Sequence, residues 1–249
     1  MELPENADEL WRRRYSEAQA QIAGADAAGL SGVTGALYRL CCGLTANLAV
    51  MGAAINLMSA GGSDGVAAAS DGRSKDVDEL QFTAGEGPGH DAFAARRPVL
   101  TPDPRSAAGQ QWPSYTPEAL SAGVGAVFAF PLNVGAARFG VLDVYAEAPG
   151  SLSSEHMAMA LTFAQIATEI LVDGDLTTAG GELDRGLSHA LDYRAEIHQA
   201  QGMAMVDLEI GPGEALIWMR AHAFAHDKTL IDLARKIIAG FDLSEADDD

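Results

Sequence analysis

An α+β chain in two parts is the fold class that this sequence predicts: an antiparallel sheet with flanking helices, followed by an all-α three-helix bundle. Short apolar runs typical of strands alternate with helical repeats between residues 34 and 173. Beyond Asp173 the strand pattern disappears and helical spacing continues to Gly240. The chain has 249 residues, 48% of them hydrophobic, which is enough for two units that each bury a core.

The first elements are a helical lead-in at residues 1–33 and a helix at 34–48. In the helix, apolar side chains recur at three- and four-residue steps. A strand is predicted at residues 50–58. The Gly-rich run at 61–65 is expected to turn the chain into a second strand at 66–70.

The middle of the chain supplies the remaining sheet. A short helix is predicted at residues 92–97, and a short strand follows at 98–100, where prolines stop it. Residues 124–130 and 139–145 resemble paired strands. Residues 133–137 would form their hairpin loop, with Gly135 supplying backbone freedom.

The rest of the chain is predicted to be helical. Ser153 is a suitable N-cap for a long apolar helix that runs to Leu171. Thr229 and Asp232 form a capping-box-like pair at the start of the last helix, which has the clearest 3.6-residue repeat in the chain. Three helices are expected after residue 181: residues 183–208, ended by Gly211-Pro212-Gly213, then 214–226 and 230–238. Residues 241–249 form an acidic tail.

Charge and composition exclude several classes of protein. With 16 basic and 35 acidic residues, the chain has a net charge of −19. This charge excludes a protein that binds nucleic acid through a broadly basic surface, and it argues against docking on an acidic membrane. No signal peptide and no apolar run long enough to span a membrane is visible. The adjacent Cys41 and Cys42 fit neither a disulfide framework nor a zinc site. We therefore expect a cytoplasmic protein with no metal and no cofactor.

No catalytic arrangement emerges from the local spacing of residues. The run Gly85-Glu86-Gly87-Pro88-Gly89 lacks the Lys-Ser/Thr of a phosphate-binding loop and is interpreted as a tight turn before a helix. Cys41 and Cys42 lie on a predicted apolar helix, where cysteine acts as a small hydrophobic residue. His90 and Asp91 are interpreted as a solvated turn. The prediction is that this protein is not an enzyme.

Several short motifs, in order, resemble known families. QFTAGEGPGHDAFAARRPVLTPD from Gln81, GVGAVFAFPL from Gly123 and FGVLDVYAEAPGSL from Phe139 resemble the GAF domains of actinobacterial regulators. The stretch from Ile197 to Gly240 resembles an ANTAR domain. The resemblance implies a GAF-like sensory domain at residues 34–173 and an ANTAR-like RNA-binding domain at 184–240. It also implies a function, transcription antitermination through paired RNA hairpins in nascent transcripts.

Polar and cationic residues of the helical region are the candidate RNA contacts. This region holds six of the 16 basic residues and four of the six histidines. Cationic side chains would bind the RNA phosphates, and polar side chains would contact the unstacked bases of the loops. Many ANTAR domains have a lysine where this chain has Gln201, which predicts RNA binding that is weaker, more salt-sensitive or dependent on dimerisation. The candidates are Arg194, His198, Gln201, Gly202, Arg220, His222, Lys228, Arg235 and Lys236.

Two further expectations concern partners. A homodimer is predicted because the long helices carry apolar residues that one sheet face does not obviously cover: Leu161, Ile166, Ile170, Leu171, Leu183, Leu187, Leu191 and Ile197. A small-molecule ligand of unknown identity in the GAF domain remains open, as does a filled pocket without one. The alternative function is a non-enzymatic sensing or protein-interaction module that has lost RNA binding.

Overall fold

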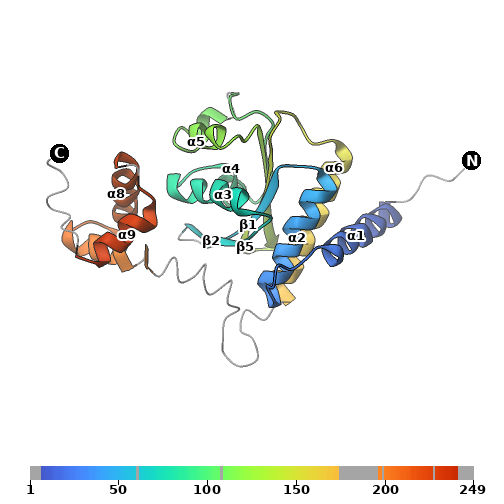
Figure 1. Cartoon of the computed structure of the whole chain (residues 1–249), viewed down its shortest axis with the longest axis horizontal. Helices are drawn as coiled ribbons and strands as arrows, with labels where there is room; N and C mark the ends of the chain where they lie inside the picture. The colour runs from blue at the N-terminus through green and yellow to red at the C-terminus, as the bar shows by residue number, and fades with distance from the viewer. Residues whose placement is uncertain are drawn as a thin grey trace, which may run out of the picture.

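The computed structural model describes residues 7–59, 62–106, 109–173, 196–197, 199–226 and 228–240. These residues form a sheet region, with helices on both faces of one five-stranded antiparallel sheet, and a helical region at the C-terminal end (Figure 1). None of the described residues of the helical region is in a strand. The predicted α+β class is confirmed.

The sheet has the strand order β2-β1-β5-β4-β3, and all neighbouring strands are antiparallel. The predicted hairpin is formed by β4 and β5, but its loop is shorter than residues 133–137. Gly135 has a φ of +56°, which glycine adopts without steric cost. The strands are β1 (Gly52–Ser59), β2 (Gly62–Ala69), β3 (Val99–Thr101), β4 (Ala126–Val134) and β5 (Ala137–Ala146).

The second strand differs from its prediction. Residues 61–65 were expected to form a turn, yet β2 already begins at Gly62. Its pairing with β1 is irregular between Ile55 and Asn56 and between Leu57 and Met58. The hydrogen bonds to β1 therefore outweigh the low strand propensity of glycine, and the register shifts accommodate the irregular pairing of the two strands.

One face of the sheet is covered by α2 (Gly32–Leu48) and α6 (Ser154–Asp173), and α1 (Ala7–Gly24) packs against both helices. Leu142 and Val144 of β5 point into this core. On α6, Ile166 and Leu171 are buried in the same core, so these two residues offer no surface to a partner, contrary to the argument for dimerisation from the sequence. Leu161 is exposed by 46%.

The other face is covered by α3 (Gly72–Ala84), α4 (Pro88–Ala95) and α5 (Tyr115–Ser121); a short 3-10 helix, η1 (Gly109–Gln111), precedes α5. No element was predicted at α3, because its charged residues do not follow a clear helical stripe. Its N-cap, Asp71, accepts a hydrogen bond from the Ser74 backbone at 2.7 Å. The predicted helix at residues 92–97 is α4, which begins earlier because proline suits a first helical turn.

The helical region contains a helical segment at residues 199–207, α8 (Pro212–Ala225) and α9 (Leu230–Ile238). The predicted helix at 183–208 lies partly outside the described residues. Pro212 begins α8 instead of separating two helices. Thr229 caps α9 as predicted, accepting a hydrogen bond from the Asp232 backbone at 3.2 Å. The core of this region is made of small and aliphatic residues, including Ala204, Ala215, Met219, Leu233 and Ile237.

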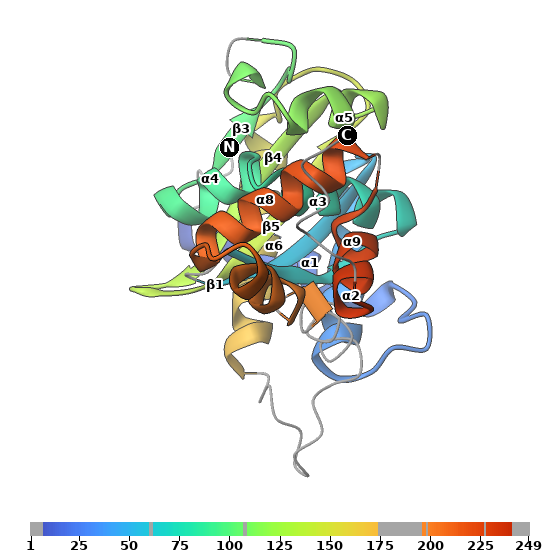
Figure 2. The ribbon, with the colours of Figure 1, turned by 90° about the vertical axis from the view of Figure 1, so that its left-hand side faces the viewer.

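The two regions meet along α3 and α8. Phe82 of α3 belongs to the same hydrophobic cluster as the core of the helical region. Figure 2 shows α8 lying across the side of the sheet region that carries α3 and α4. This contact determines which residues of α8 remain accessible.

Candidate nucleic-acid interface and interdomain pocket

Three aromatic rings lie in a row along α8. Trp218, His222 and His226 follow at intervals of four residues, which places them on one helix face. The ring centroids of Trp218 and His222 are 4.9 Å apart, and those of His222 and His226 are 4.0 Å apart, with both pairs stacked. His226 is exposed, and the other two are half-buried. We call these residues the ring row; sequence reasoning identified only His222.

The ring row is held by backbone contacts at the end of α8. The Nδ1 atom of His226 lies 2.8 Å from the carbonyl oxygen of His222. The Lys228 backbone N–H donates to the Ala223 carbonyl at 2.9 Å, which holds the backbone of Lys228 at the end of α8, and its side chain is exposed. Flat rings beside a cation are the groups that stack on unpaired bases and contact their phosphates.

Two further candidate cations lie on α9. Arg235 and Lys236 are exposed in its last turn, where positive charge is favourable near the helix C-terminus. The Arg235 Nε donates to Glu196 Oε2 at 2.8 Å, so this ion pair joins α9 to the first part of the helical region. Glu196 thus partly neutralises the charge of Arg235.

The other predicted residues are only partly placed. Gln201 is half-buried and Gly202 is exposed on the helical segment at 199–207. A Cβ at Gly202 would meet no atom of the described residues within 4 Å, so this glycine is not required for close packing against them. Arg194 and His198 lie outside the described residues.

Arg220 turns toward the sheet region instead of open solvent. Its guanidinium carbon lies 5.7 Å from the centroid of the Phe82 ring, in cation–π geometry. A Cβ built on Gly85 would come within 2.6 Å of its Nη1 atom. No acceptor among the described residues hydrogen-bonds to its buried Nε, and burial lowers the pKa of the guanidinium. In this arrangement the Arg220 side chain is half-buried at the contact between the two regions.

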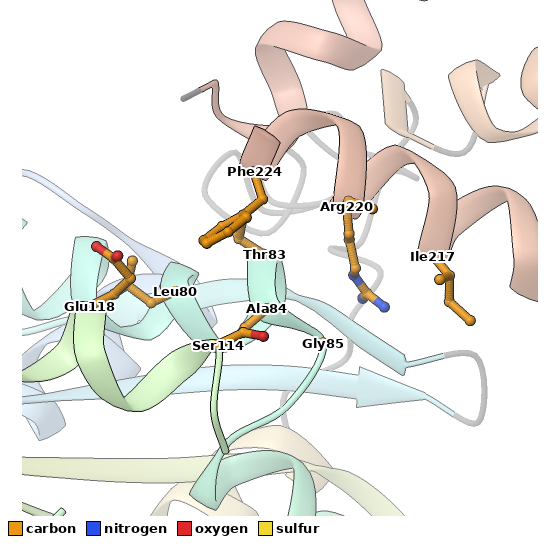
Figure 3. Close-up of a pocket in the computed structure, with 10 residues that line it drawn as sticks. Leu80, Thr83, Ala84, Gly85, Ser114, Glu118, Ile217, Arg220 and Phe224 are labelled. Carbon is orange, nitrogen blue, oxygen red and sulfur yellow. The ribbon is translucent and has the colours of Figure 1, made fainter. Parts of the chain in front are cut away.

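A pocket of about 440 Å³ surrounds the Arg220 side chain (Figure 3). The end of α3, the start of α5 and one face of α8 contribute its walls. These elements are far apart in the sequence, so the sequence alone gave no sign of it. The residues lining it are Leu80, Thr83, Ala84, Gly85, Ser114, Glu118, Ile217, Arg220, Ala221 and Phe224.

A buried polar network lies between the sheet and α3. Asp78 accepts hydrogen bonds from the Asn56 amide at 2.7 Å and from the Tyr145 hydroxyl at 2.9 Å. Gln81 donates to Asp143 Oδ2 at 2.9 Å, and its Oε1 accepts from the Gly89 backbone at 2.7 Å. The network thus occupies this face of the sheet with the protein's own side chains.

The two carboxyl groups of this network differ in protonation. Burial and the neighbouring charge of Asp78 hold the pKa of Asp143 well above its usual range, and burial also raises the pKa of Asp78. Since two buried carboxylates cannot both ionise cheaply, Asp143 keeps its proton and Asp78 carries the charge.

The Gly85–Gly89 turn is confirmed in part: Gly85 ends α3 with a φ of +72°, while Pro88 and Gly89 already belong to α4.

The remaining chemistry-bearing residues have structural surroundings. Cys41 is fully buried and Cys42 half-buried on α2, and burial raises the pKa of both thiols. His90 and Asp91 were expected in a solvated turn, but both lie in α4; Asp91 is exposed, as expected, and accepts from the Trp112 indole at 3.2 Å. Over the described residues, no group of three His, Cys, Asp or Glu side chains could hold a metal ion, and no helix is long and apolar enough to cross a membrane.

Two family models match the chain. Residues 34–172 match the GAF domain, and residues 185–238 match the ANTAR domain. The comparison with curated proteins gives no match.

Solved structures give matches at low identity. One is the GAF domain of a phosphoenolpyruvate-protein phosphotransferase from Coxiella burnetii, with 14% identity, a TM-score of 0.49 and coverage of 68% of this chain and 96% of that one. The GAF domain from the Acinetobacter phosphoenolpyruvate-protein phosphotransferase has 10% identity, a TM-score of 0.48 and coverage of 66% and 94%. A type II free methionine-R-sulfoxide reductase from Thermoplasma acidophilum has 16% identity, a TM-score of 0.42 and coverage of 66% and 96%.

Proposed function

The chain belongs to the GAF domain family and carries an ANTAR domain after it, and from this premise we propose that it is a transcription antitermination regulator of the actinobacterial type. GAF and ANTAR domains are regulatory and non-catalytic, and an ANTAR domain implies RNA binding. The proposal assigns sensing to residues 34–173 and binding of paired RNA hairpins to residues 184–240, in a cytoplasmic homodimer.

The observation that carries the RNA assignment is the ring row beside Lys228. Trp218, His222 and His226 offer stacked rings at the helix end where Lys228 is exposed, within the ANTAR match. A loop base that is splayed out of a hairpin extends such a row by stacking on the outer face of an end ring, and the adjacent phosphates bind cations. A local site of this kind explains how a chain of net charge −19 can bind RNA.

Few cations take part, so the affinity should fall only slowly as salt is raised. Lys228 and Lys236 are exposed, Arg235 is paired with Glu196, and Arg220 is half-buried at the interdomain contact. Each neutralised phosphate contributes a slope of about −0.7 to −0.9 in log affinity against log salt. We therefore expect a slope of only a few units.

The test is binding of the full chain to an RNA with two short-loop hairpins, followed by fluorescence anisotropy across a salt series. Lys236→Ala should weaken binding to all hairpin sequences and reduce the slope by about one unit. Gln201→Lys should tighten binding by restoring a cation at the family's usual position. Lys75→Ala is the matched control, because Lys75 is an exposed lysine on α3 that pairs with Glu79.

Two results would contradict the proposal. One is that the folded protein does not bind the two-hairpin RNA even at low salt, which would favour the protein-interaction alternative. The other is an equal loss of affinity in Lys75→Ala and Lys236→Ala, which would mean that RNA responds to overall charge and not to the ANTAR surface.

A further inference from the structure

The pocket between α3, α5 and α8 has the size of a ligand site. Its volume of about 440 Å³ lies within the range of about 300–1,000 Å³ that is usual for small-molecule pockets. It lies outside the polar network of Asp78 and Asp143, which fills the space between α3 and the sheet. The pocket and the network are therefore separate features.

One wall of the pocket is unusually apolar for a surface. Ile217 and Phe224 of α8 are exposed by 66% and 69%, and both project on the side of α8 that faces α3 (Figure 3). They are seven residues apart, so they lie on one helix face with Arg220 and Ala221 between them. Leu80 and Ala84 supply apolar surface from α3. This wall suits the hydrocarbon part of a ligand.

The polar part of the pocket contains a desolvated cation. The buried Nε of Arg220 has no hydrogen-bond acceptor among the described residues, and the guanidinium rests on the Phe82 ring. A buried donor without an acceptor is costly, and a planar guanidinium binds carboxylates in a bidentate way. Glu118 also lines the pocket, as do Thr83 and Ser114. The carboxylate of Glu86 already accepts from the backbone N–H groups of Ser114 and Tyr115, at 2.6 and 3.2 Å.

We propose that this pocket binds a small amphipathic carboxylate, with the carboxylate on the guanidinium of Arg220 and the apolar body between Ile217 and Phe224 of α8 and Leu80 of α3. Such a molecule touches both regions at once. It therefore stabilises their contact by an amount that grows with ligand concentration. A consequence that rests on the proposed function is that bound ligand keeps Arg220 away from RNA.

The test uses the full chain without RNA, so its result does not depend on RNA binding. The fluorescent probe anilinonaphthalene sulfonate, an amphipathic anion, is titrated and then displaced by octanoate or by the uncharged octanol. We expect saturable probe binding, and displacement by octanoate at a concentration at least tenfold lower than by octanol. That ratio measures the contribution of the carboxylate.

Two pairs of variants locate the binding. Ala221→Phe fills the pocket and should abolish saturable probe binding, whereas Ala225→Phe, on an exposed residue of the same helix outside the pocket, should leave it unchanged. Arg220→Met should remove the preference for octanoate over octanol, and Arg220→Lys should retain most of it. Equal titrations of Ala221→Phe and Ala225→Phe, or equal displacement by octanoate and octanol in the unmodified protein, would overturn the proposal.

Discussion

Asp143 shows how a single buried residue couples this fold to pH. It lies on β5 between residues that point into the other core, so the strand alternation directs its carboxyl group toward α3. Burial and the charge of Asp78 raise its pKa well above the usual range. In the unfolded chain the same group ionises at its ordinary, lower pKa, so the native state binds an extra proton between the two values.

Asp143→Asn should therefore make the protein less sensitive to alkali. The stability that the extra proton provides is fully present below the unfolded pKa and is lost as pH rises toward the native pKa. Asparagine keeps a neutral donor and an acceptor for Gln81, so the variant should gain stability relative to the unmodified protein as pH rises from 5 to 8. Urea denaturation at several pH values measures the difference. A constant difference across this range would show that Asp143 is ionised in the native state.

Trp218 gives the second prediction at this scale. Stacking of one base on an aromatic ring contributes about 1–3 kcal/mol, so Trp218→Leu should weaken hairpin binding roughly 5- to 150-fold. Leucine keeps apolar packing, and the salt slope should not change because no phosphate contact is lost. Trp218→Tyr, which keeps a ring, should retain most of the affinity. Unchanged affinity in the leucine variant would remove the ring row from the RNA site.

Among the elements, α9 shows most clearly how sequence pattern becomes structure. Its apolar residues all fall on one face, and Leu230, Leu233 and Ile237 are buried. Thr229 accepts a hydrogen bond from the Asp232 backbone and donates its hydroxyl to the Asp232 carboxylate at 2.7 Å. With nine residues, this helix is too short to be stable alone and depends on its cap and its packing.

Thr229→Ala should destabilise the helical region by about 1 kcal/mol, the usual effect of losing an N-cap. Hydrogen exchange over residues 230–238 would report the faster local opening. Ser114→Ala is the matched control, because Ser114 precedes α5 without a side-chain cap hydrogen bond. Similar effects of the two substitutions on α9 would contradict the capping role of Thr229.

At the scale of the whole molecule, the exposed surface of α6 is the described part of the predicted homodimer interface. Leu161 and Val172 are exposed by 46% and 52%, although most apolar residues of α6 are buried against the sheet and α2. The predicted dimer therefore depends on a smaller apolar surface of α6 than the sequence suggested, together with residues 183–191 outside the described part of the chain.

Leu161→Glu should convert the proposed homodimer to a monomer at tens of micromolar protein, because a carboxylate would be buried in the interface. Sedimentation velocity measures the change. Val134→Glu is the control, since Val134 is exposed at the β4–β5 hairpin. A monomer before substitution, or a dimer that tolerates Leu161→Glu, would exclude this interface.

The sequence by itself determined most of the elements and both domain identities. Helical periodicity located α2, α6 and α9, and the paired apolar runs located β4 and β5, because these elements bury one regular stripe or face. It missed α3, whose charged residues obscure the helical period, and it misread the Gly-rich start of β2, which is held by the neighbouring strand.

The candidate functional residues also divide into those that the sequence identified and those that only the tertiary structure placed. Local composition identified Lys228 and Lys236 as accessible cations, and side chains at the helix surface remain where local geometry puts them. Only the tertiary structure decided that Arg220 packs half-buried against Phe82, and that it lines a pocket. The residues that meet there are more than 130 positions apart in the chain. Such a contact depends on how two separately folded surfaces pack, which no periodicity within either segment encodes.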